Sequence, residues 1–234
     1  MSNDGSLIIT IDGPAGSGKT SAARGVAQRL DLSVLDTGAM YRTAALIALR
    51  EGIDPGDGKA IAARVEALGI EVDFKTTPPA VLLDGHPVGE AIRSSDVEAI
   101  VSEVSAQPEV RRALVQTQRT IAKQHPRIVT EGRDQGSVVF PDAAVRFFLT
   151  ASSGNRAHRR SEQVEAGGGH ADEEAIRQGI EERDRLDASR EDAPLVRPEG
   201  AIEVDTDNLT LQEVIDQLVV EVEKHVARRK DAAS

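Results

Sequence analysis

A phosphate-binding loop is the clearest chemical feature of the sequence. The segment Gly13-Pro14-Ala15-Gly16-Ser17-Gly18-Lys19-Thr20 has the GxxxxGK[ST] spacing, in which backbone N–H groups surround nucleotide phosphates and the lysine reaches the β- and γ-phosphate oxygens. Thr20 is expected to place its hydroxyl on Mg²⁺, and Ser21 extends the nucleotide-binding segment. A glycine turn that merely joins a strand to a helix is the alternative. The β-branched run before the loop and the helical pattern after it favour a triphosphate site.

A cluster of arginines lies on one face of a predicted helix over residues 153–166. Arg156, Arg159 and Arg160 are spaced i, i+3 and i+4 and therefore share that face. Gly167-Gly168-Gly169 follows the helix and indicates a mobile lid. A solvated helix face with salt bridges is the alternative. Beside a phosphate loop, we interpret the cluster as positive charge that lid closure delivers to a transferring phosphoryl group.

The next predicted helix, over residues 172–190, carries a second charged set. Arg183, Asp187 and Arg190 are spaced i, i+4 and i+7, so they also share one helix face. Two arginines that flank a carboxylate form either an internal ion-pair ladder or a site that grips a sugar hydroxyl and a phosphate. The spacing alone leaves both interpretations open.

Two further arginines follow predicted strands. Arg42 ends the segment Asp36-Thr37-Gly38-Ala39-Met40-Tyr41-Arg42, and Arg133 lies in Glu131-Gly132-Arg133-Asp134. Open parallel sheets bind their ligands at the carboxyl ends of their strands, where both segments are expected. Surface ion pairs are the alternative for either arginine alone. Together with the phosphate loop, the two segments indicate a place where two anions meet.

Five short aliphatic and β-branched runs predict the strands that position these side chains. They are Leu7–Asp12, Ser33–Asp36, Arg127–Glu131, Val145–Leu149 and Ala201–Asp205. Helical patterns separate the runs, which predicts an α/β fold with a five-stranded parallel sheet. The last helix is expected to start at a capping box formed by Thr210 and Glu213.

One stretch departs from the alternation of strands and helices. The short strand patterns Ile70–Phe74 and Val81–Leu83 are followed by Asp84-Gly85, a typical hairpin turn. We interpret residues 58–105 as an inserted subdomain at the edge of the sheet and residues 153–190 as the lid region. No separate second domain is required, so residues 1–234 are expected to form a single domain.

The composition argues against several classes of protein. A net charge of −11 and an aromatic content of 2% disfavour a nucleic-acid or anionic-membrane binder. The absence of cysteine excludes disulfides and thiolate metal sites. No segment approaches the ~20 apolar residues of a membrane helix, and the N-terminal residues lack a signal-peptide pattern. We expect a cytoplasmic monomer that acts on small molecules, with neither nucleic acid nor membrane as a partner.

Several motifs in order resemble the bacterial cytidylate kinases, which belong to the nucleoside monophosphate kinase group of P-loop kinases. The matching segments are Ile11-Asp12-Gly13-Pro14, Leu35 to Arg42, Gly132-Arg133-Asp134, Val138-Val139-Phe140-Pro141, Arg156-Ala157-His158-Arg159-Arg160, and Glu182-Arg183-Asp184 through Asp187 and Arg190 to Ala193-Pro194-Leu195. The resemblance implies a three-layer P-loop kinase fold, with a monophosphate-binding insertion and a helical lid. It also implies a phosphotransferase of pyrimidine nucleotide metabolism, which moves the γ-phosphoryl of ATP to CMP or dCMP with Mg²⁺.

The resemblance also implies a role for individual residues. The implied catalytic residues are Lys19, Arg133 and the lid arginines Arg156 and Arg160, and the implied ATP site is Gly13, Pro14, Ala15, Gly16, Ser17, Gly18, Lys19, Thr20 and Ser21. The implied substrate contacts are Thr37, Ser102, Arg111 and Asp134 around the pyrimidine, Arg183 and Asp187 at the sugar, Arg42, Arg133 and Arg190 at the acceptor phosphate, and Tyr41. Thr20 is the implied Mg²⁺ ligand, and Asp36 is a candidate to assist it through water.

The choice of base follows from hydrogen-bonding capacity. Cytosine presents an N4 amine donor beside N3 and O2 acceptors, which a carboxylate such as Asp134 and an arginine such as Arg111 would match. Uracil reverses the pattern at positions 4 and 3, so both protein groups would face like partners. The hypothesis is that Asp134 and Arg111 set a preference for CMP over UMP.

Two alternatives to this function stay open on the sequence. One is a small P-loop kinase for another monophosphate or for a hydroxyl metabolite, although a neutral acceptor would not need the arginines at positions 42, 133 and 190. The other is a nucleotide-dependent P-loop regulatory protein. The sequence lacks an NKxD guanine motif and an LSGGQ signature, and its lid arginines are suited to turnover.

Overall fold

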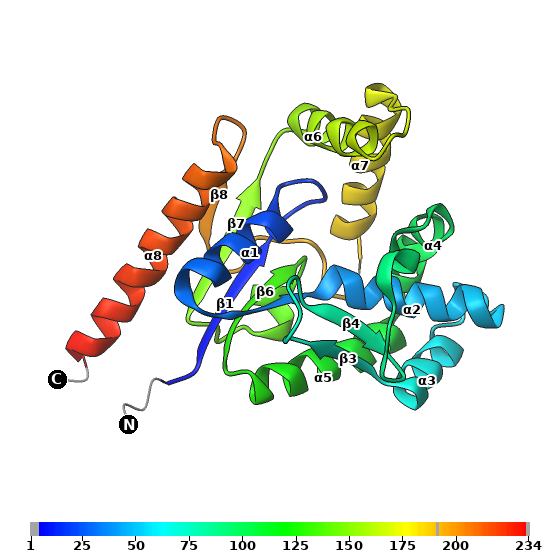
Figure 1. The fold of residues 1–234 in the computed structure, drawn as a ribbon, viewed down its shortest axis with the longest axis horizontal. Helices are drawn as coiled ribbons and strands as arrows, with labels where there is room; N and C mark the ends of the chain where they lie inside the picture. The colour runs from blue at the N-terminus through cyan, green and yellow to red at the C-terminus, as the bar shows by residue number, and fades with distance from the viewer. Residues whose placement is uncertain (1–4, 191, 233–234) are drawn as a thin grey trace. The chain divides into compact units, whose positions relative to one another are not determined.

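The computed structural model describes residues 5–190 and 192–232, and strands alternate with helices along most of the chain (Figure 1). The strands are β1 (Leu7–Asp12), β2 (Ser33–Asp36), β3 (Ile70–Asp73), β4 (Ala80–Leu83), β5 (His86–Pro87), β6 (Arg127–Gly132), β7 (Val145–Thr150) and β8 (Ile202–Asp205). The α-helices are α1 (Lys19–Leu30), α2 (Thr37–Glu51), α3 (Gly58–Leu68), α4 (Ser95–Ala106), α5 (Pro108–Gln124), α6 (Ser153–Ala166), α7 (Glu173–Ala188) and α8 (Leu211–Ala232). Two shorter helical turns are η1 (Gly89–Arg93) and η2 (Gln135–Val139).

A five-stranded parallel sheet has the strand order β2-β6-β1-β7-β8. In the register of β1 and β7, Ile9 lies beside Val145 and Ile11 beside Phe147. Phe147 in turn lies beside Ile202 of β8. Ile9, Ile11 and Phe147 are fully buried, as expected for the near-continuous apolar strands of a parallel sheet. The sheet confirms the α/β fold class predicted from the sequence.

The chain divides into two compact units. Unit 1 contains residues up to 8 and residues 33–130, and unit 2 contains residues 9–32 and those from 131 onward. The boundaries fall inside β1, directly before β2 and inside β6. The insertion and the lid assigned from the sequence stay predictions.

In unit 1, α2 packs against α3 and α4, and α3 packs against α5. A small antiparallel sheet joins β3, β4 and β5, with Ile70 beside Leu83. Asp84 and Gly85 both have positive φ, 51° and 72°, the backbone of a two-residue hairpin turn between β4 and β5. These strands and this turn confirm the short hairpin elements predicted between residues 70 and 93.

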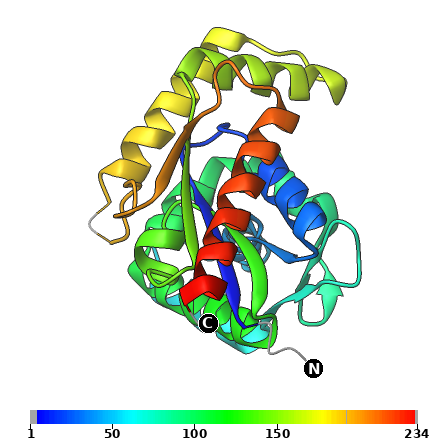
Figure 2. The same ribbon diagram turned by 90° about the vertical axis from the view of Figure 1, so that its left-hand side faces the viewer.

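In unit 2, α8 packs along α1 and against β7 (Figures 1 and 2). Gly25 permits the close approach, because a Cβ at this position would lie 2.1 Å from Ile215 Cδ1. The N-terminus of α8 is capped as predicted: the Thr210 N–H donates to Glu213 Oε2 at 2.8 Å, and the Glu213 N–H donates to Thr210 Oγ1 at 3.3 Å. α8 is therefore fixed at its start by two reciprocal bonds and along its length by apolar packing.

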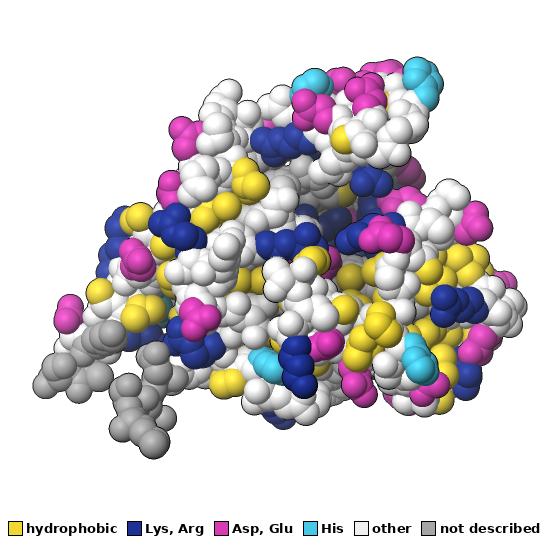
Figure 3. Space-filling view, in the orientation of Figure 1, with side chains coloured by type: hydrophobic (Ala, Val, Ile, Leu, Met, Phe, Trp, Pro, Cys, Tyr) yellow, Lys and Arg dark blue, Asp and Glu magenta, His cyan; other side chains and the backbone are white. Residues whose placement is uncertain are grey.

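The other helical pair of unit 2, α6 and α7, lies side by side. Each helix is capped by a side chain, Ser152 for α6 and Asp172 for α7. Acidic and histidine side chains gather over the end where the two helices join (Figure 3), and Glu165 and Glu173 are exposed there. In the described part of the chain, none of the helices has the length and apolar character needed to cross a membrane.

Candidate active site

The phosphate loop lies between the end of β1 and the first residue of α1, as predicted. Gly13 has a φ of 149°, and a Cβ there would lie 2.2 Å from the carbonyl oxygen of Leu149 in β7. Gly18 is the N-cap of α1 and is left-handed, with a φ of 88°. Both positions therefore require glycine. The loop approaches the end of β7 closely at Gly13 and leads into the N-terminus of α1, a favourable place for an anion.

Lys19 is buried against its own loop. Its Nζ donates to the Pro14 carbonyl oxygen at 2.7 Å and approaches Ser17 Oγ at 3.5 Å. The pKa of the ammonium is lowered to about 7, chiefly by burial and then by the nearby Arg133 guanidinium. The Glu131 carboxylate acts in the opposite direction. The bond to the loop carbonyl is one that an anionic phosphate oxygen can replace.

The Thr20 hydroxyl is held by a carboxylate that sequence reasoning missed. Thr20 Oγ1 donates to Glu131 Oε1 at 2.6 Å. Glu131 lies near the end of β6, and a carboxylate at the carboxyl end of a strand was the signal that could have identified it. Asp36 caps α2, because its Oδ1 accepts the Ala39 N–H at 2.9 Å, and its assistance to Mg²⁺ through water stays a prediction.

These oxygen donors fit the chemistry of Mg²⁺. A hydroxyl and a carboxylate are hard ligands, and Mg²⁺ is usually held by one or two protein oxygens together with substrate phosphates and water. Across residues 5–190 and 192–232, no group of three or more His, Cys, Asp or Glu side chains could hold a metal ion by itself. Thr20 and Glu131 would therefore suit a Mg²⁺ ion that takes its other ligands from nucleotide phosphates and water.

Asp12, the last residue of β1, joins the phosphate loop to the segment after β6. Its Oδ1 accepts the Gln135 N–H at 2.8 Å and its Oδ2 accepts the Gly136 N–H at 2.7 Å. Burial raises the pKa of this carboxyl to about 6, although both N–H bonds lower it. Asp134, the buried residue directly before η2, lies close enough to raise the Asp12 pKa as well. The sequence analysis did not assign Asp12 a role, and its position directly before the loop was the available signal.

Asp187 bridges two arginines in unit 2. Arg133 Nε donates to Asp187 Oδ2 at 2.9 Å, and Arg190 pairs with the other carboxylate oxygen. Burial raises the pKa of Asp187, but Arg133 and then Arg190 outweigh it and hold the pKa below its usual value. Arg183 is half-buried on the same helix and acts in the same direction. Arg133 and Arg190, two of the three arginines predicted for the acceptor phosphate, are thus held by one carboxylate.

The three arginines of α6 have different environments. Arg156 is buried, pairs with Asp184 of α7, and donates from Nη1 to the Ala15 carbonyl oxygen at 3.0 Å. Arg159 Nη1 donates to Thr206 Oγ1 at 3.0 Å. Arg160 is exposed. Of these three side chains, Arg156 bonds directly to the phosphate loop, and its partner Asp184 was not singled out from the sequence.

The remaining predicted side chains gather in unit 1 on α2, α4 and α5. The Arg111 guanidinium lies 5.4 Å from the centroid of the Tyr41 ring, and its Nη1 donates to the Ser105 carbonyl oxygen at 3.0 Å. Arg42 Nη1 lies 2.6 Å from Glu98 Oε2 in an ion pair. Thr37 is the buried first residue of α2, and Ser102 is half-buried on α4. Unit 1 therefore supplies one set of the predicted site residues, and unit 2 supplies the set around the phosphate loop.

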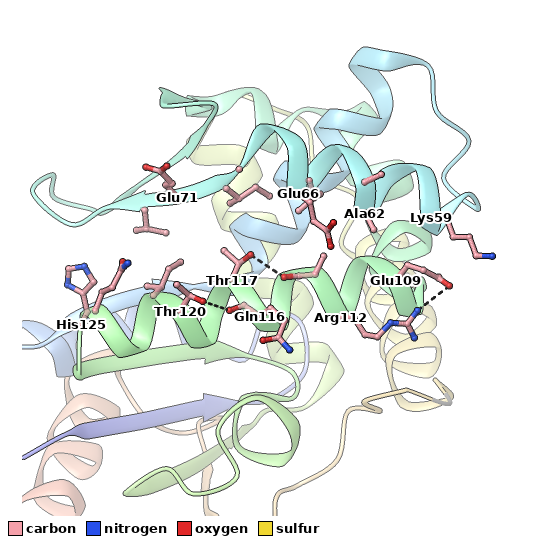
Figure 4. Close-up of a pocket in the computed structure, with 18 of the residues that line it drawn as sticks. Lys59, Ala62, Glu66, Glu71, Glu109, Arg112, Gln116, Thr117, Thr120 and His125 are labelled. Atoms are coloured by element: carbon pink, nitrogen blue, oxygen red, sulfur yellow. Dashed lines mark hydrogen bonds and ion pairs between the residues drawn. The ribbon is translucent and has the colours of Figure 1, made fainter.

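A separate groove of about 980 Å³ lies in unit 1 between α3 and α5 (Figure 4). None of the predicted site residues lines it. The hydroxyl of Thr117 donates to the Ala113 carbonyl of its own helix at 3.1 Å, and Arg112 pairs with Glu109 at 3.3 Å. Thr117 and Arg112 are thus bonded within α5.

The fold and the site together define a P-loop kinase: a parallel sheet, a glycine loop at a helix N-terminus, a buried lysine and converging arginines. A sequence model of the family described as "Cytidylate kinase" matches residues 9–224. The chain belongs to the cytidylate kinase family.

Individual relatives agree with this assignment. The chain is 46% identical to a cytidylate kinase of Rhodococcus jostii, over 92% of this chain and 94% of that protein. It is 44% identical to a cytidylate kinase of Mycolicibacterium paratuberculosis, over 97% and 100% of the two chains. A crystal structure of an uncharacterized protein from Eubacterium ventriosum is similar in fold, with a TM-score of 0.51, 11% identity and coverage of 94% and 99%.

Proposed function

We propose that this protein transfers the γ-phosphoryl group of ATP to CMP or dCMP and releases CDP or dCDP and ADP. The observation that carries the proposal is the family match over residues 9–224, which includes the phosphate loop and every side chain assigned here to the site. The reaction moves a phosphoryl group between two anions, so it requires in-line placement and neutralised charge more than covalent help from the protein.

The donor half is built on the phosphate loop. The loop amides and Lys19 bind the β- and γ-phosphates, and Arg156, already bonded to the loop, neutralises charge on the transferring group. Thr20, oriented by Glu131, would hold Mg²⁺, which supplies further neutralisation of the phosphates when bound. Lys19 exchanges its bond to the Pro14 carbonyl for a phosphate oxygen.

The acceptor half is built on Arg42, Arg133 and Arg190, which bind the CMP phosphate, and on Arg183 and Asp187, which contact the sugar. Asp187 also keeps Arg133 and Arg190 in place, because both pair with its carboxylate. The attacking phosphate oxygen is already anionic, so the reaction needs no general base.

Base recognition in this proposal uses one buried hydrogen-bond acceptor and one buried hydrogen-bond donor. Asp134 accepts the cytosine N4 amine, and Arg111 donates to N3 and O2. Arg111 is supported for this role by its packing over Tyr41 and its bond to the Ser105 carbonyl. Thr37 and Ser102 complete the surroundings of the base.

The proposal places the enzyme in the cytoplasm as a monomer in pyrimidine nucleotide metabolism, with ATP and CMP as partners. The net charge of −11 and the acidic end of the α6–α7 pair support an absence of nucleic-acid and anionic-membrane partners, because both would be repelled.

An assay of ADP release with CMP, dCMP, UMP, AMP and GMP as acceptors tests the function. We expect turnover with CMP and dCMP and none with purine monophosphates. Lys19→Ala is the control and should lose activity while it unfolds as cooperatively as the wild type. Preference for another monophosphate would favour the alternative kinase, and ATP binding without turnover on any acceptor would favour a regulatory protein.

A further inference from the structure

One carboxylate ties the α6–α7 pair to the phosphate loop. Asp184 Oδ1 accepts the Ala15 backbone N–H at 3.4 Å, and Oδ2 pairs with Arg156. Arg156 also donates to the Ala15 carbonyl oxygen at 3.0 Å. The loop packs directly on α6 at this point, because a Cβ at Gly16 would lie 3.1 Å from Arg156 Cβ.

The two partners of Asp184 are groups that a nucleotide phosphate needs. Amides of the loop bind phosphate oxygens, and Arg156 is the α6 arginine that touches the loop. A carboxylate oxygen and a phosphate oxygen are both anionic acceptors, so they cannot occupy the same donors together. The Asp184 side chain is 21% exposed, which leaves it a path to solvent when it is displaced.

We propose that Asp184 is an internal stand-in for a phosphate oxygen. Before nucleotide binds, it holds the Ala15 N–H and Arg156, and it gives up both to the incoming triphosphate. This inference rests on the proposed function of the loop as an ATP site. Asp184 is a positioning residue in this scheme, since it keeps Arg156 beside the loop until the phosphate arrives.

The scheme predicts a cost in apparent affinity. ATP must displace the Asp184 carboxylate from the Ala15 N–H and Arg156. The measured affinity is therefore the intrinsic affinity multiplied by the fraction of molecules in which Asp184 has released them. Removing the charge at residue 184 should remove this competition. We expect Asp184→Asn to bind ATP about threefold to tenfold more tightly than the wild type.

Calorimetric titration of the purified protein with ATP and with tripolyphosphate tests the inference. Tripolyphosphate is included because it reports on the phosphate site without a base. Glu182→Gln is the matched control: it removes a carboxylate two residues away on α7 that pairs with the exposed Arg185, and its affinities should equal those of the wild type. Asp184→Ala serves as a second variant, and thermal unfolding checks that each protein is folded.

The possible outcomes distinguish the proposed role of Asp184 from the proposed function of the loop as an ATP site. The proposed role of Asp184 is supported if Asp184→Asn and Asp184→Ala bind both ligands more tightly than the wild type while Glu182→Gln binds them equally. Equal or weaker binding by folded Asp184 variants overturns it, because Asp184 would then support the bound state. Failure of the wild type to bind ATP overturns the proposed function instead.

Discussion

Thr20 Oγ1 and Glu131 Oε1 lie 2.6 Å apart, so the hydroxyl assigned to Mg²⁺ is already oriented by a carboxylate in the folded chain. Glu131→Gln keeps the shape of this partner but removes its charge. We expect the Mg²⁺ concentration for half-maximal activity to rise about tenfold or more, as for other groups that orient a metal ligand.

A titration of activity with Mg²⁺ measures this effect. Thr20→Ser retains the hydroxyl and should stay close to the wild type, whereas Thr20→Val should lose most activity. An unchanged Mg²⁺ requirement in Glu131→Gln would show that the carboxylate only packs against Thr20.

ATP binding should take up a proton above neutral pH. The pKa of Lys19 is about 7 in the structure, whereas bound phosphates favour the ammonium and raise that pKa. The affinity for ATP therefore falls as pH rises above about 7, and this group has no effect on affinity well below that pH. Calorimetry at pH 8 in buffers of different ionisation enthalpy should detect uptake approaching one proton. Lys19→Arg, which stays charged, is the control and should take up none.

Asp187 should contribute strongly to stability at neutral pH. Its carboxylate is buried between Arg133 and Arg190, so Asp187→Asn leaves two guanidinium groups without their partner and should cost about 3 kcal/mol of unfolding free energy. The folded pKa lies below the unfolded value of 3.8, so this stability is present above about pH 4 and is lost as pH falls through the folded pKa.

Denaturant unfolding at pH 7 and at pH 3.5 tests this sign. The difference in unfolding free energy between wild type and Asp187→Asn should be smaller at pH 3.5 than at pH 7. Asp216→Asn, which removes an exposed and solvent-screened partner of Arg29, is the control and should leave stability close to that of the wild type at both pH values. A difference in unfolding free energy that is larger at pH 3.5 than at pH 7 would be incompatible with an ion-paired Asp187.

Asp134 should control the choice between CMP and UMP. Asp134→Asn offers an amine where uracil presents an acceptor, so the ratio of kcat/KM for CMP to that for UMP should fall about tenfold or more. Asp142→Asn, an exposed residue in the same region, is the control. Steady-state kinetics with both acceptors would reject the assignment if the ratio did not change.

The sequence was sufficient for the fold and for the type of site. The strands, the parallel sheet and the capping box of α8 follow from local patterns, because apolar runs and caps act over a few residues. The phosphate loop has a spacing that few other structures share.

The hydrogen-bond and ion-pair partners of the charged groups could not be predicted from local sequence patterns. Thr20 and Glu131, or Ala15 and Asp184, are far apart in sequence, and no local pattern indicates that they meet. The helical spacing of Arg156, Arg159 and Arg160 also could not show that one is buried, one is bonded to Thr206 and one faces solvent. Such differences depend on which element packs against each turn of the helix.

The two hydrogen bonds of Asp12 to consecutive amides bear on the entropy of catalysis. They make the phosphate loop and the Arg133-Asp134 segment parts of a single rigid frame. If the Arg133-Asp134 segment binds the acceptor as proposed, the conformational entropy of placing it beside the phosphate loop is lost once, when the chain folds, rather than in every turnover. A loosened frame would slow the transfer step even if each nucleotide still bound with its usual affinity.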